Sequence, residues 1–244
     1  MSERFFIGRK REKQLLVSYL ESDESEFVAV YGRRRVGKTY LIQQVIEDEA
    51  VFYVAGIHKA PKKEQLDNFM SHIPHKGTRV PKAKSWLEAF RALSTYLETL
   101  PEGRKIIFID EMPWMDTPKS LFIAGLENFW NGWACRRNDI KLIVCGSATS
   151  WIINKLIRAK GGLHNRVTHK IPLQPFTLRE TKQYFDKRGF RLNKKDVAEA
   201  YMILGGVPFY LKQLNKGESI AQNIDRVLFD KDGELHDEFQ DVFE

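Results

Sequence analysis

The sequence predicts an α/β fold built on a mostly parallel sheet, and three observations lead to this prediction. Short apolar runs rich in β-branched residues alternate with amphipathic segments over the first two thirds of the 244-residue chain. The amphipathic segments are long enough to be the helical crossovers that join parallel strands. From Thr177 onward the strand pattern disappears and only helical periodicity remains. We therefore expect an α/β core over residues 1–175 and a small helical lid domain over residues 176–244.

The elements follow in order along the chain. The predicted strands are Phe27–Tyr31, Val51–Ala55, Lys105–Asp110, Ile140–Cys145 and His169–Leu173. The predicted helices of the core are Lys38–Glu47, Ser85–Leu100, Ser120–Trp133 and Ala148–Ile157, and those of the lid are Leu178–Arg188, Lys194–Leu204, Ile220–Asp230 and the acidic segment Glu234–Glu244. The segment Pro74–Pro81 contains glycine and lysine between two prolines, and we expect it to be a surface loop.

A glycine- and arginine-rich loop connects the first predicted strand to the first predicted helix. Its sequence is Gly32-Arg33-Arg34-Arg35-Val36-Gly37-Lys38-Thr39, followed by Tyr40. In this context the pattern G-x-x-x-x-G-K-[ST] wraps backbone N–H groups around phosphates, and the helix directs its positive N-terminus at them. Lys38 would reach the outer phosphates, and the Thr39 hydroxyl would bind Mg²⁺. A basic turn with two glycines is the competing interpretation, which the flanking strand and helix disfavour.

The third predicted strand ends in two carboxylates, Asp110 and Glu111. An apolar run ending this way places them at the carboxyl edge of a buried parallel strand, where open α/β sheets bind ligands. Asp110 would hold Mg²⁺ directly or through water, and Glu111 would polarise the water that attacks the γ-phosphate. An acidic pair capping a helix is the alternative. The position of this pair, separated from the loop by another strand, also argues against a GTPase.

Two further side chains are candidates for the same edge of the sheet. Ser147 follows the fourth predicted strand and is the candidate sensor of the γ-phosphate or the attacking water, although Ser and Thr here could equally cap the next helix. Arg166 precedes the last strand and is the candidate arginine finger, acting in its own or a neighbouring subunit. A plain surface arginine explains Arg166 equally well, and Arg158 is the second candidate.

Two segments outside the core complete the expected site. In the helical part, the run from Leu204 to Leu211 contains two glycines and Pro208, which suits a helix junction. The functional interpretation is that Pro208 and the glycine backbone close over the adenine. The N-terminal run Phe5-Phe6-Ile7-Gly8-Arg9-Lys10-Arg11-Glu12, and Ile7, Gly8 and Arg9 within it, would line the base from the other side.

The composition of the chain limits where the protein is expected to act and which partners it is expected to bind. The chain is 43% hydrophobic and 29% charged, no run approaches the roughly 18 apolar residues of a membrane span, and the N-terminus lacks an apolar signal, so we expect a cytoplasmic protein with no membrane partner. Net charge is +7, and part of the excess falls in Lys59–Lys84 with three histidines nearby. This charge fits nucleic acid, but it also fits loop arginines at a phosphate site plus solvated lysines. Cys135 and Cys145 are expected to be buried, reduced thiols.

The sequence has the motifs of the archaeal and bacterial P-loop ATP-binding proteins of the AAA-like and STAND class in the same order as those proteins. It resembles them over nearly the whole chain. The likeness rests on Phe6-Ile7-Gly8-Arg9, the phosphate loop Gly32–Thr39, Ile109-Asp110-Glu111, Gly146-Ser147 and Gly206-Val207-Pro208. The arginine-rich loop is the most specific of these motifs. The resemblance implies a P-loop NTPase with a five-stranded sheet of order 5-1-4-3-2, a helical lid, and in many relatives a winged-helix or nuclease-like domain that follows. We therefore expect an appended or separate C-terminal effector domain.

Three functions remain in competition at this point. The first is Mg²⁺-dependent hydrolysis of ATP to ADP and phosphate by a molecular switch or motor, with catalysis by Lys38, Glu111 and Arg166. The second is a nucleotide-gated binding module that holds ATP or ADP with little turnover. The third is a nucleic-acid-binding module tuned by ATP. The retention of Glu111 favours the first function. The sequence leaves the target, the pathway and assembly into a homo-oligomer open.

Overall fold

The structure is a computed structural model that describes residues 7–75, 82–158, 162–163 and 165–240. The chain divides into two compact units. The core unit comprises Arg11–Arg34 and Lys38–Leu173. The helical unit comprises Met1–Lys10, Arg35–Gly37 and Gln174–Glu244.

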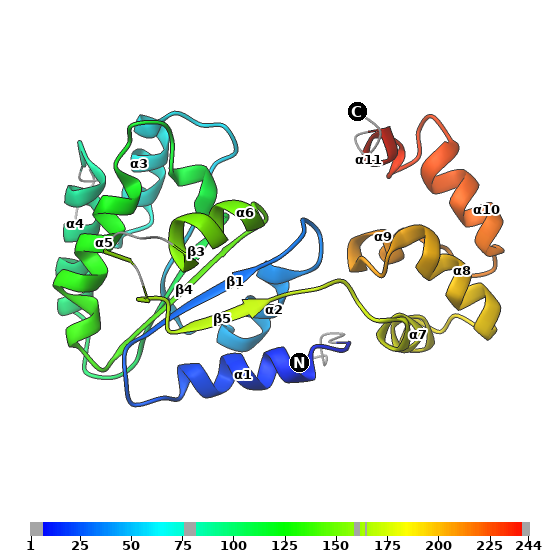
Figure 1. Cartoon of the computed structure of the whole chain (residues 1–244), viewed down its shortest axis with the longest axis horizontal. Coiled ribbons are helices and arrows are strands. Elements are labelled where there is room, and N and C mark those ends of the chain that lie inside the picture. Colours follow the sequence, from blue (N-terminus) through cyan, green and yellow to red (C-terminus); the bar gives the residue numbers. More distant parts are fainter. Residues whose placement is uncertain (1–6, 76–81, 159–161, 164, 241–244) are drawn as a thin grey trace. The chain divides into compact units, whose positions relative to one another are not determined.

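A five-stranded parallel sheet forms the centre of the core unit, with strand order β2-β3-β4-β1-β5 (Figure 1). The strands are β1 (Glu26–Tyr31), β2 (Ala50–Ala55), β3 (Lys105–Asp110), β4 (Ile140–Gly146) and β5 (His169–Pro172). All five strands were predicted, and each predicted end lies within one residue of the observed end. The order 5-1-4-3-2 implied by the resemblance is confirmed, since it is this order read from the opposite edge.

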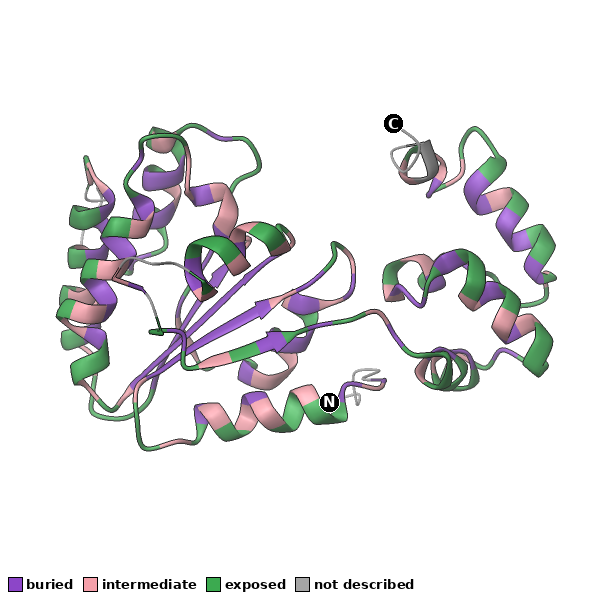
Figure 2. Cartoon of the chain, viewed as in Figure 1, coloured by how far each residue is buried: buried purple, intermediate pink, exposed green. Residues whose placement is uncertain are grey.

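The interior strands are buried on both faces, as expected for a parallel sheet between helices. Every residue of β3 and β4 is buried (Figure 2), whereas the edge strand β2 leaves Tyr53 38% exposed. Side chains alternate between the two faces. In β4, Leu142 and Val144 join the large apolar cluster that contains the buried residues of α4 and α5, and the alternation directs Cys145 to the opposite face.

The helices of the core follow the expected crossovers, with two additions. They are α1 (Lys10–Leu20), α2 (Lys38–Ile46), α3 (Lys62–Ser71), α4 (Trp86–Glu98), α5 (Phe122–Gly132) and α6 (Thr149–Ile152), with short 3₁₀ or π turns η1 (Met112–Met115), η2 (Ala134–Arg136) and η3 (Ile153–Ile157). Helices α1 and α3 were not predicted. The expected helix Ala148–Ile157 is instead a single α-turn that widens into the π turn η3. Most of the predicted loop Pro74–Pro81 lies outside the described residues.

The helical unit has its own small apolar core. Its helices are α7 (Leu178–Lys187), α8 (Lys194–Leu204), α9 (Pro208–Lys212), α10 (Ile220–Ile224) with the π turn η4 (Asp225–Phe229), and α11 (His236–Gln240). Thr177 and Ser219 begin α7 and α10 with reciprocal capping boxes. Apolar side chains from α7, α8, α9 and α10 form one cluster. The expected helix Ile220–Asp230 begins as α10 and continues directly as the π turn η4, and the acidic helix begins at His236.

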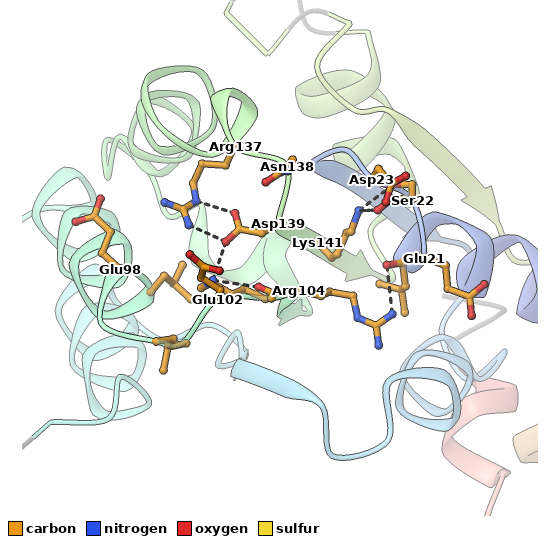
Figure 3. A pocket seen from close by; sticks show the side chains of 15 residues that line it. Glu21, Ser22, Asp23, Glu98, Glu102, Arg104, Arg137, Asn138, Asp139 and Lys141 are labelled. Atoms are coloured by element: carbon orange, nitrogen blue, oxygen red, sulfur yellow. Dashed lines mark hydrogen bonds and ion pairs between the residues drawn. The ribbon is translucent and has the colours of Figure 1, made fainter.

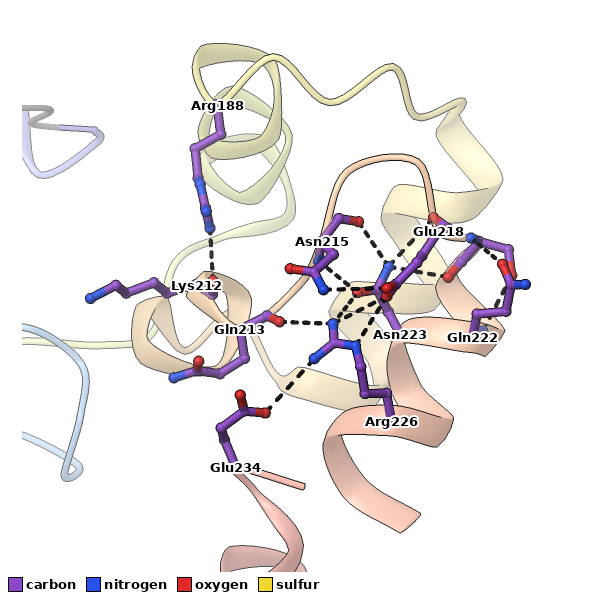
Figure 4. A network of polar contacts seen from close by, with 10 residues as sticks. Arg188, Lys212, Gln213, Asn215, Glu218, Gln222, Asn223, Arg226 and Glu234 are labelled. Atoms are coloured by element: carbon purple, nitrogen blue, oxygen red, sulfur yellow. Dashed lines mark hydrogen bonds and ion pairs between the residues drawn. The ribbon is translucent and has the colours of Figure 1, made fainter. Parts of the chain in front are cut away.

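A polar network secures the connection between α9 and α10 (Figure 4). The fully buried Asn223 accepts from the Asn215 backbone N–H at 2.7 Å and donates to the Asn215 carbonyl at 3.1 Å. Arg226 donates to the Gln213 carbonyl and the Asn223 side chain and pairs with Glu218 at 3.1 Å. Because its polar groups are satisfied by one another, this network acts as internal structure.

Candidate functional site

The loop after β1 has the backbone geometry that a phosphate-binding loop needs. Gly32 and Gly37 have φ angles of +154° and +92°, which side-chain-bearing residues rarely adopt. A β-carbon at Gly32 would lie 2.1 Å from the Leu173 carbonyl oxygen, so this glycine also allows a close backbone approach. Helix α2 begins at Lys38, directly after the loop. The N-terminus of α2 therefore faces the loop, as anion binding requires.

Lys38 is a buried cation held by its own loop. The residue is 5% exposed, and its Nζ donates to the carbonyl oxygens of Gly32 and Arg33, both at 3.1 Å. Within the described part of the chain, no carboxylate forms an ion pair with Lys38. A buried charge compensated only by dipoles favours the arrival of an anion.

Thr39 and Asp110 meet at the carboxyl edge of the sheet. The Thr39 hydroxyl donates to Asp110 Oδ2 at 2.8 Å, and the Glu111 backbone N–H donates to Asp110 Oδ1 at 2.8 Å. Two oxygen ligands this close suit Mg²⁺, which is bound by few protein ligands together with substrate phosphates. The hydroxyl proton points at the carboxylate, so the lone pairs of the Thr39 oxygen remain available for a cation. The described residues contain no cluster of three or more His, Cys, Asp or Glu side chains that could hold a metal by themselves.

Glu111 lies beside Ser147. Ser147 follows β4, and both its backbone N–H and its hydroxyl donate to Glu111 Oε2 at 3.1 Å. Glu111 itself has φ +43°, in the left-handed region. Thus the Thr39 hydroxyl and the Glu111 backbone N–H donate to the Asp110 carboxylate, and Ser147 donates to the Glu111 carboxylate. The structure brings these four predicted residues together in one network.

Sequence reasoning missed one member of this network. The Cys145 thiol donates to Asp110 Oδ1, and its side chain is fully buried. Burial, reinforced by the Asp110 charge, raises the pKa of the Cys145 thiol well above its usual value, so the thiol keeps the proton that it donates. Cys145 was expected to be buried, which is correct. Cys135 is exposed, contrary to the prediction, because its apolar neighbours in sequence lead into the surface turn η2.

The two arginine candidates lie outside this network. Arg166 is exposed on a turn, where its backbone N–H donates to the Leu163 carbonyl at 3.1 Å. Arg158 is exposed at the end of η3. Neither guanidinium forms a hydrogen bond or ion pair with Lys38, Thr39 or another described residue. The finger role of Arg166 stays a prediction.

The N-terminal candidates belong to the helical unit. The Arg9 backbone N–H donates to Glu180 Oε1 at 3.2 Å, and its guanidinium lies over the Phe176 ring at 5.0 Å from the centroid. Ile7 is buried and Gly8 has φ +67°. Phe5 and Phe6 lie outside the described residues. Pro208 is the first residue of α9, as a helix junction requires, and its proposed role over the adenine stays a prediction.

The loop arginines have different environments. Arg33 and Arg34 are exposed, as is Tyr40 on α2. Arg35 has φ +69°, lies over the Phe209 ring at 4.2 Å from the centroid, and forms an ion pair with Glu238 at 2.7 Å. Val36 is buried and accepts a hydrogen bond from Arg9.

Comparison with known proteins defines the family. A sequence model of ATPase domains found predominantly in Archaea matches residues 6–214. The chain belongs to this family of ATPase domains. The match includes every candidate site residue from Ile7 to Pro208. Glu238, which pairs with Arg35, lies outside it.

Relatives of the ATPase domain agree with the observed architecture. An uncharacterized protein of Methanocaldococcus jannaschii, MJECL04, is 28% identical over 214 residues, which cover 86% of this chain and 44% of the relative. The chain therefore spans less than half the length of this curated relative. Among solved structures, the Walker-type ATPase PABY2304 of Pyrococcus abyssi matches with a TM-score of 0.69 at 20% identity, covering 98% of this chain and 76% of that one. A Pyrococcus horikoshii STAND protein with a tetratricopeptide repeat sensor, PH0952, matches with a TM-score of 0.59 at 17% identity, covering 96% and 34%. These structures share the P-loop ATPase fold.

One four-residue match in the ATPase domain could suggest guanine recognition, and sequence reasoning overlooked it. The residues Asn193-Lys194-Lys195-Asp196 fit the guanine-reading pattern Asn-Lys-x-Asp. In the structure they start α8, where the Asn193 side chain accepts from the Asp196 backbone N–H at 2.9 Å. This is a helix N-cap, which explains the choice of Asn by local structure.

A hollow of about 1020 Å³ lies at the amino edge of the sheet in the ATPase domain (Figure 3). Its cations are engaged within the protein: Lys105 and Arg137 pair with Asp139, and the buried Lys141 donates to Ser22 and the Glu24 carbonyl. A set of charges this well satisfied is structural. No helix among the described residues has the length and apolar content to cross a membrane.

Proposed function

We propose that the chain binds ATP with Mg²⁺ and hydrolyses it to ADP and phosphate, as the nucleotide-dependent switch or motor of a larger AAA-like or STAND protein. One observation carries this proposal. The buried Lys38, the Thr39–Asp110 pair and the Glu111 carboxylate lie at the carboxyl edge of one parallel sheet. Open α/β sheets bind ligands at this edge.

Each side chain has a role that follows from its contacts. Lys38 would exchange the Gly32 and Arg33 carbonyls for phosphate oxygens, which are stronger acceptors because they are charged. Thr39 and Asp110 would hold the cation. Mg²⁺, when bound, would neutralise phosphate charge and fix the geometry of the reacting group. Glu111 would accept the proton of the attacking water.

The same contacts give a specific reason to keep the binding-module alternative. Glu111 Oε2 accepts both Ser147 donors, so in this state part of the candidate base is occupied. A protein resting in this state would bind nucleotide and turn it over slowly. In that case bound ADP should survive purification, because exchange limits the cycle. We propose Ser147 as the group that releases Glu111 when a γ-phosphate offers the hydroxyl a second charged acceptor.

Two substitutions test the proposal. Lys38→Ala should weaken ATP binding, because the cation for the outer phosphates is lost. Glu111→Gln should keep binding and lose hydrolysis, because glutamine is similar in size and cannot accept the proton. Binding is measured by fluorescence titration with a labelled ATP, and hydrolysis by phosphate release. Equal turnover of Glu111→Gln and the parent protein would remove Glu111 from catalysis.

We also propose partners of the ATPase, which are nucleic acid, neighbouring subunits and an effector domain. The exposed basic residues His58, Lys59, Lys63, His72, Lys82 and Lys84 would suit a nucleic-acid phosphate backbone. Measuring turnover with and without DNA, at several protein and salt concentrations, separates an autonomous enzyme from a stimulated one and from one that requires assembly. Rescue on mixing Arg166→Ala with Glu111→Gln would show a finger acting between subunits. We place the choice of target in an effector domain that is appended or separate.

A further inference from the structure

The strongest unassigned feature is the contact between Cys145 and Asp110. Strands β3 and β4 pair in parallel, with Ile109 opposite Val144, so the next residues along both strands are neighbours at the edge of the sheet. The Cys145 thiol uses this proximity to donate a hydrogen bond to Asp110 Oδ1. Its side chain is fully buried. A buried donor aimed at a functional carboxylate has a geometric effect that packing alone does not explain.

The two carboxylate oxygens of Asp110 accept hydrogen bonds from different groups. Oδ1 accepts from the Glu111 backbone N–H at 2.8 Å and from the Cys145 thiol. Oδ2 accepts from the Thr39 hydroxyl at 2.8 Å. Rotation of the carboxylate about its Cβ–Cγ bond would displace both oxygens together and so break the contacts of Oδ1 as well as that of Oδ2. The two Oδ1 donors therefore keep Oδ2 directed at Thr39, where the cation is expected.

We propose that Cys145 is a positioning residue that orients Asp110 for Mg²⁺. This inference rests on the proposed function, because it assumes that Asp110 serves the cation of a bound nucleotide. Cys145 acts through Asp110, and no role in contact with substrate is assigned to it. Without the thiol, Oδ1 keeps only the Glu111 N–H, and the carboxylate gains rotational freedom that cation binding must remove again.

Three substitutions separate orientation from packing. Cys145→Ser keeps a donor, Cys145→Ala removes the donor with a similar loss of volume, and Cys145→Val removes the donor while filling the space. The Mg²⁺ dependence of labelled-ATP binding is measured by fluorescence at fixed nucleotide, beginning in EDTA. We expect the Mg²⁺ midpoint of Cys145→Ala and Cys145→Val to rise about fivefold, the effect of one hydrogen bond. Cys145→Ser should stay within about twofold of the parent, and affinity in EDTA should be unchanged in all three.

Asp110→Asn, measured in parallel, separates failure of this inference from failure of the proposed function. If Asp110→Asn leaves the Mg²⁺ dependence intact, the site assignment itself is wrong. If Asp110→Asn removes the Mg²⁺ dependence while Cys145→Ala and Cys145→Val have the Mg²⁺ midpoint of the parent protein, only the role of Cys145 is refuted. Equal increases of the Mg²⁺ midpoint in Cys145→Ser and Cys145→Ala would also refute the role of Cys145, because lost side-chain volume would then explain both increases. Thermal unfolding of each variant identifies one that does not fold, and Cys145→Val then replaces Cys145→Ala in the comparison.

Discussion

Replacing Gly32 by alanine tests the close approach between the phosphate loop and the end of the sheet. The added β-carbon would lie 2.1 Å from the Leu173 carbonyl oxygen, well inside van der Waals contact. Leu173 cannot easily retreat, because its backbone N–H donates to the Tyr31 carbonyl at 2.7 Å. The loop must therefore move by about 1 Å. In enzymes, a misplacement of this size costs about 100-fold in catalytic rate.

The size of the stability effect follows from two contributions. A side-chain-bearing residue at φ +154° costs about 1–3 kcal/mol, and the clash with Leu173 adds to this, so we expect a loss of about 3 kcal/mol or more. For a chain of this length, each kcal/mol lowers the melting temperature by about 2–4 °C. Gly32→Ala should thus melt roughly 6–12 °C below the parent protein and show no stabilisation by ATP.

Gly37→Ala is the matched control for this experiment. Gly37 has φ +92°, but a β-carbon there would meet no atom within 4 Å, so alanine adds backbone strain without a clash. Gly37→Ala should therefore melt closer to the parent protein than Gly32→Ala does. The assay is thermal unfolding with and without ATP and Mg²⁺, supported by urea titration. Equal melting temperatures for the two variants would refute the reasoning from the Leu173 contact.

Two further predictions concern residues away from the loop. Arg166→Ala should lower turnover more than ATP affinity, because a finger stabilises charge that develops in the transition state; steady-state kinetics showing an unchanged kcat would exclude the role. Asp139→Asn should destabilise the fold near neutral pH. Hydrogen bonds from Arg137, then Lys105, lower the pKa of Asp139 from 3.8 to about 2. Since the folded pKa is the lower one, this contribution of ~2 kcal/mol is complete above about pH 4 and lost as the pH falls toward 2. Urea unfolding across this range should show the difference between variant and parent shrinking, and a constant difference would contradict an electrostatic origin.

The strands were predictable because burial leaves little ambiguity in the sequence. The interior strands β3 and β4 are buried at every position, so their sequences are apolar runs bounded by polar residues. Helices α1 and α3 give no such signal. In α1 only Leu16 and Leu20 are buried, and most of the remaining positions hold charged or polar residues. Such helices are stabilised mainly by tertiary packing, which a single sequence does not display.

The candidate site was predictable to the extent that chemistry fixes both residue type and spacing. Lys38 and Thr39 follow from a loop whose function depends on their order, and Asp110 follows from the end of a buried strand. Cys145 carries no such pattern. A buried cysteine is usually a small apolar residue, and only the pairing of β3 with β4 places its thiol on a carboxylate.

Arg35 shows why the variable positions of the loop resist prediction. The motif leaves these positions free because phosphate binding relies on backbone N–H groups and Lys38. A side chain there can then serve other needs, and Arg35 pairs with Glu238 and stacks on Phe209 within the helical unit. Tyr210 donates to the second oxygen of the same Glu238 carboxylate at 2.8 Å, which fixes this partner. The charge of Arg35 is thus already compensated within the helical unit, so we expect Arg35 to add little to the attraction for a phosphate.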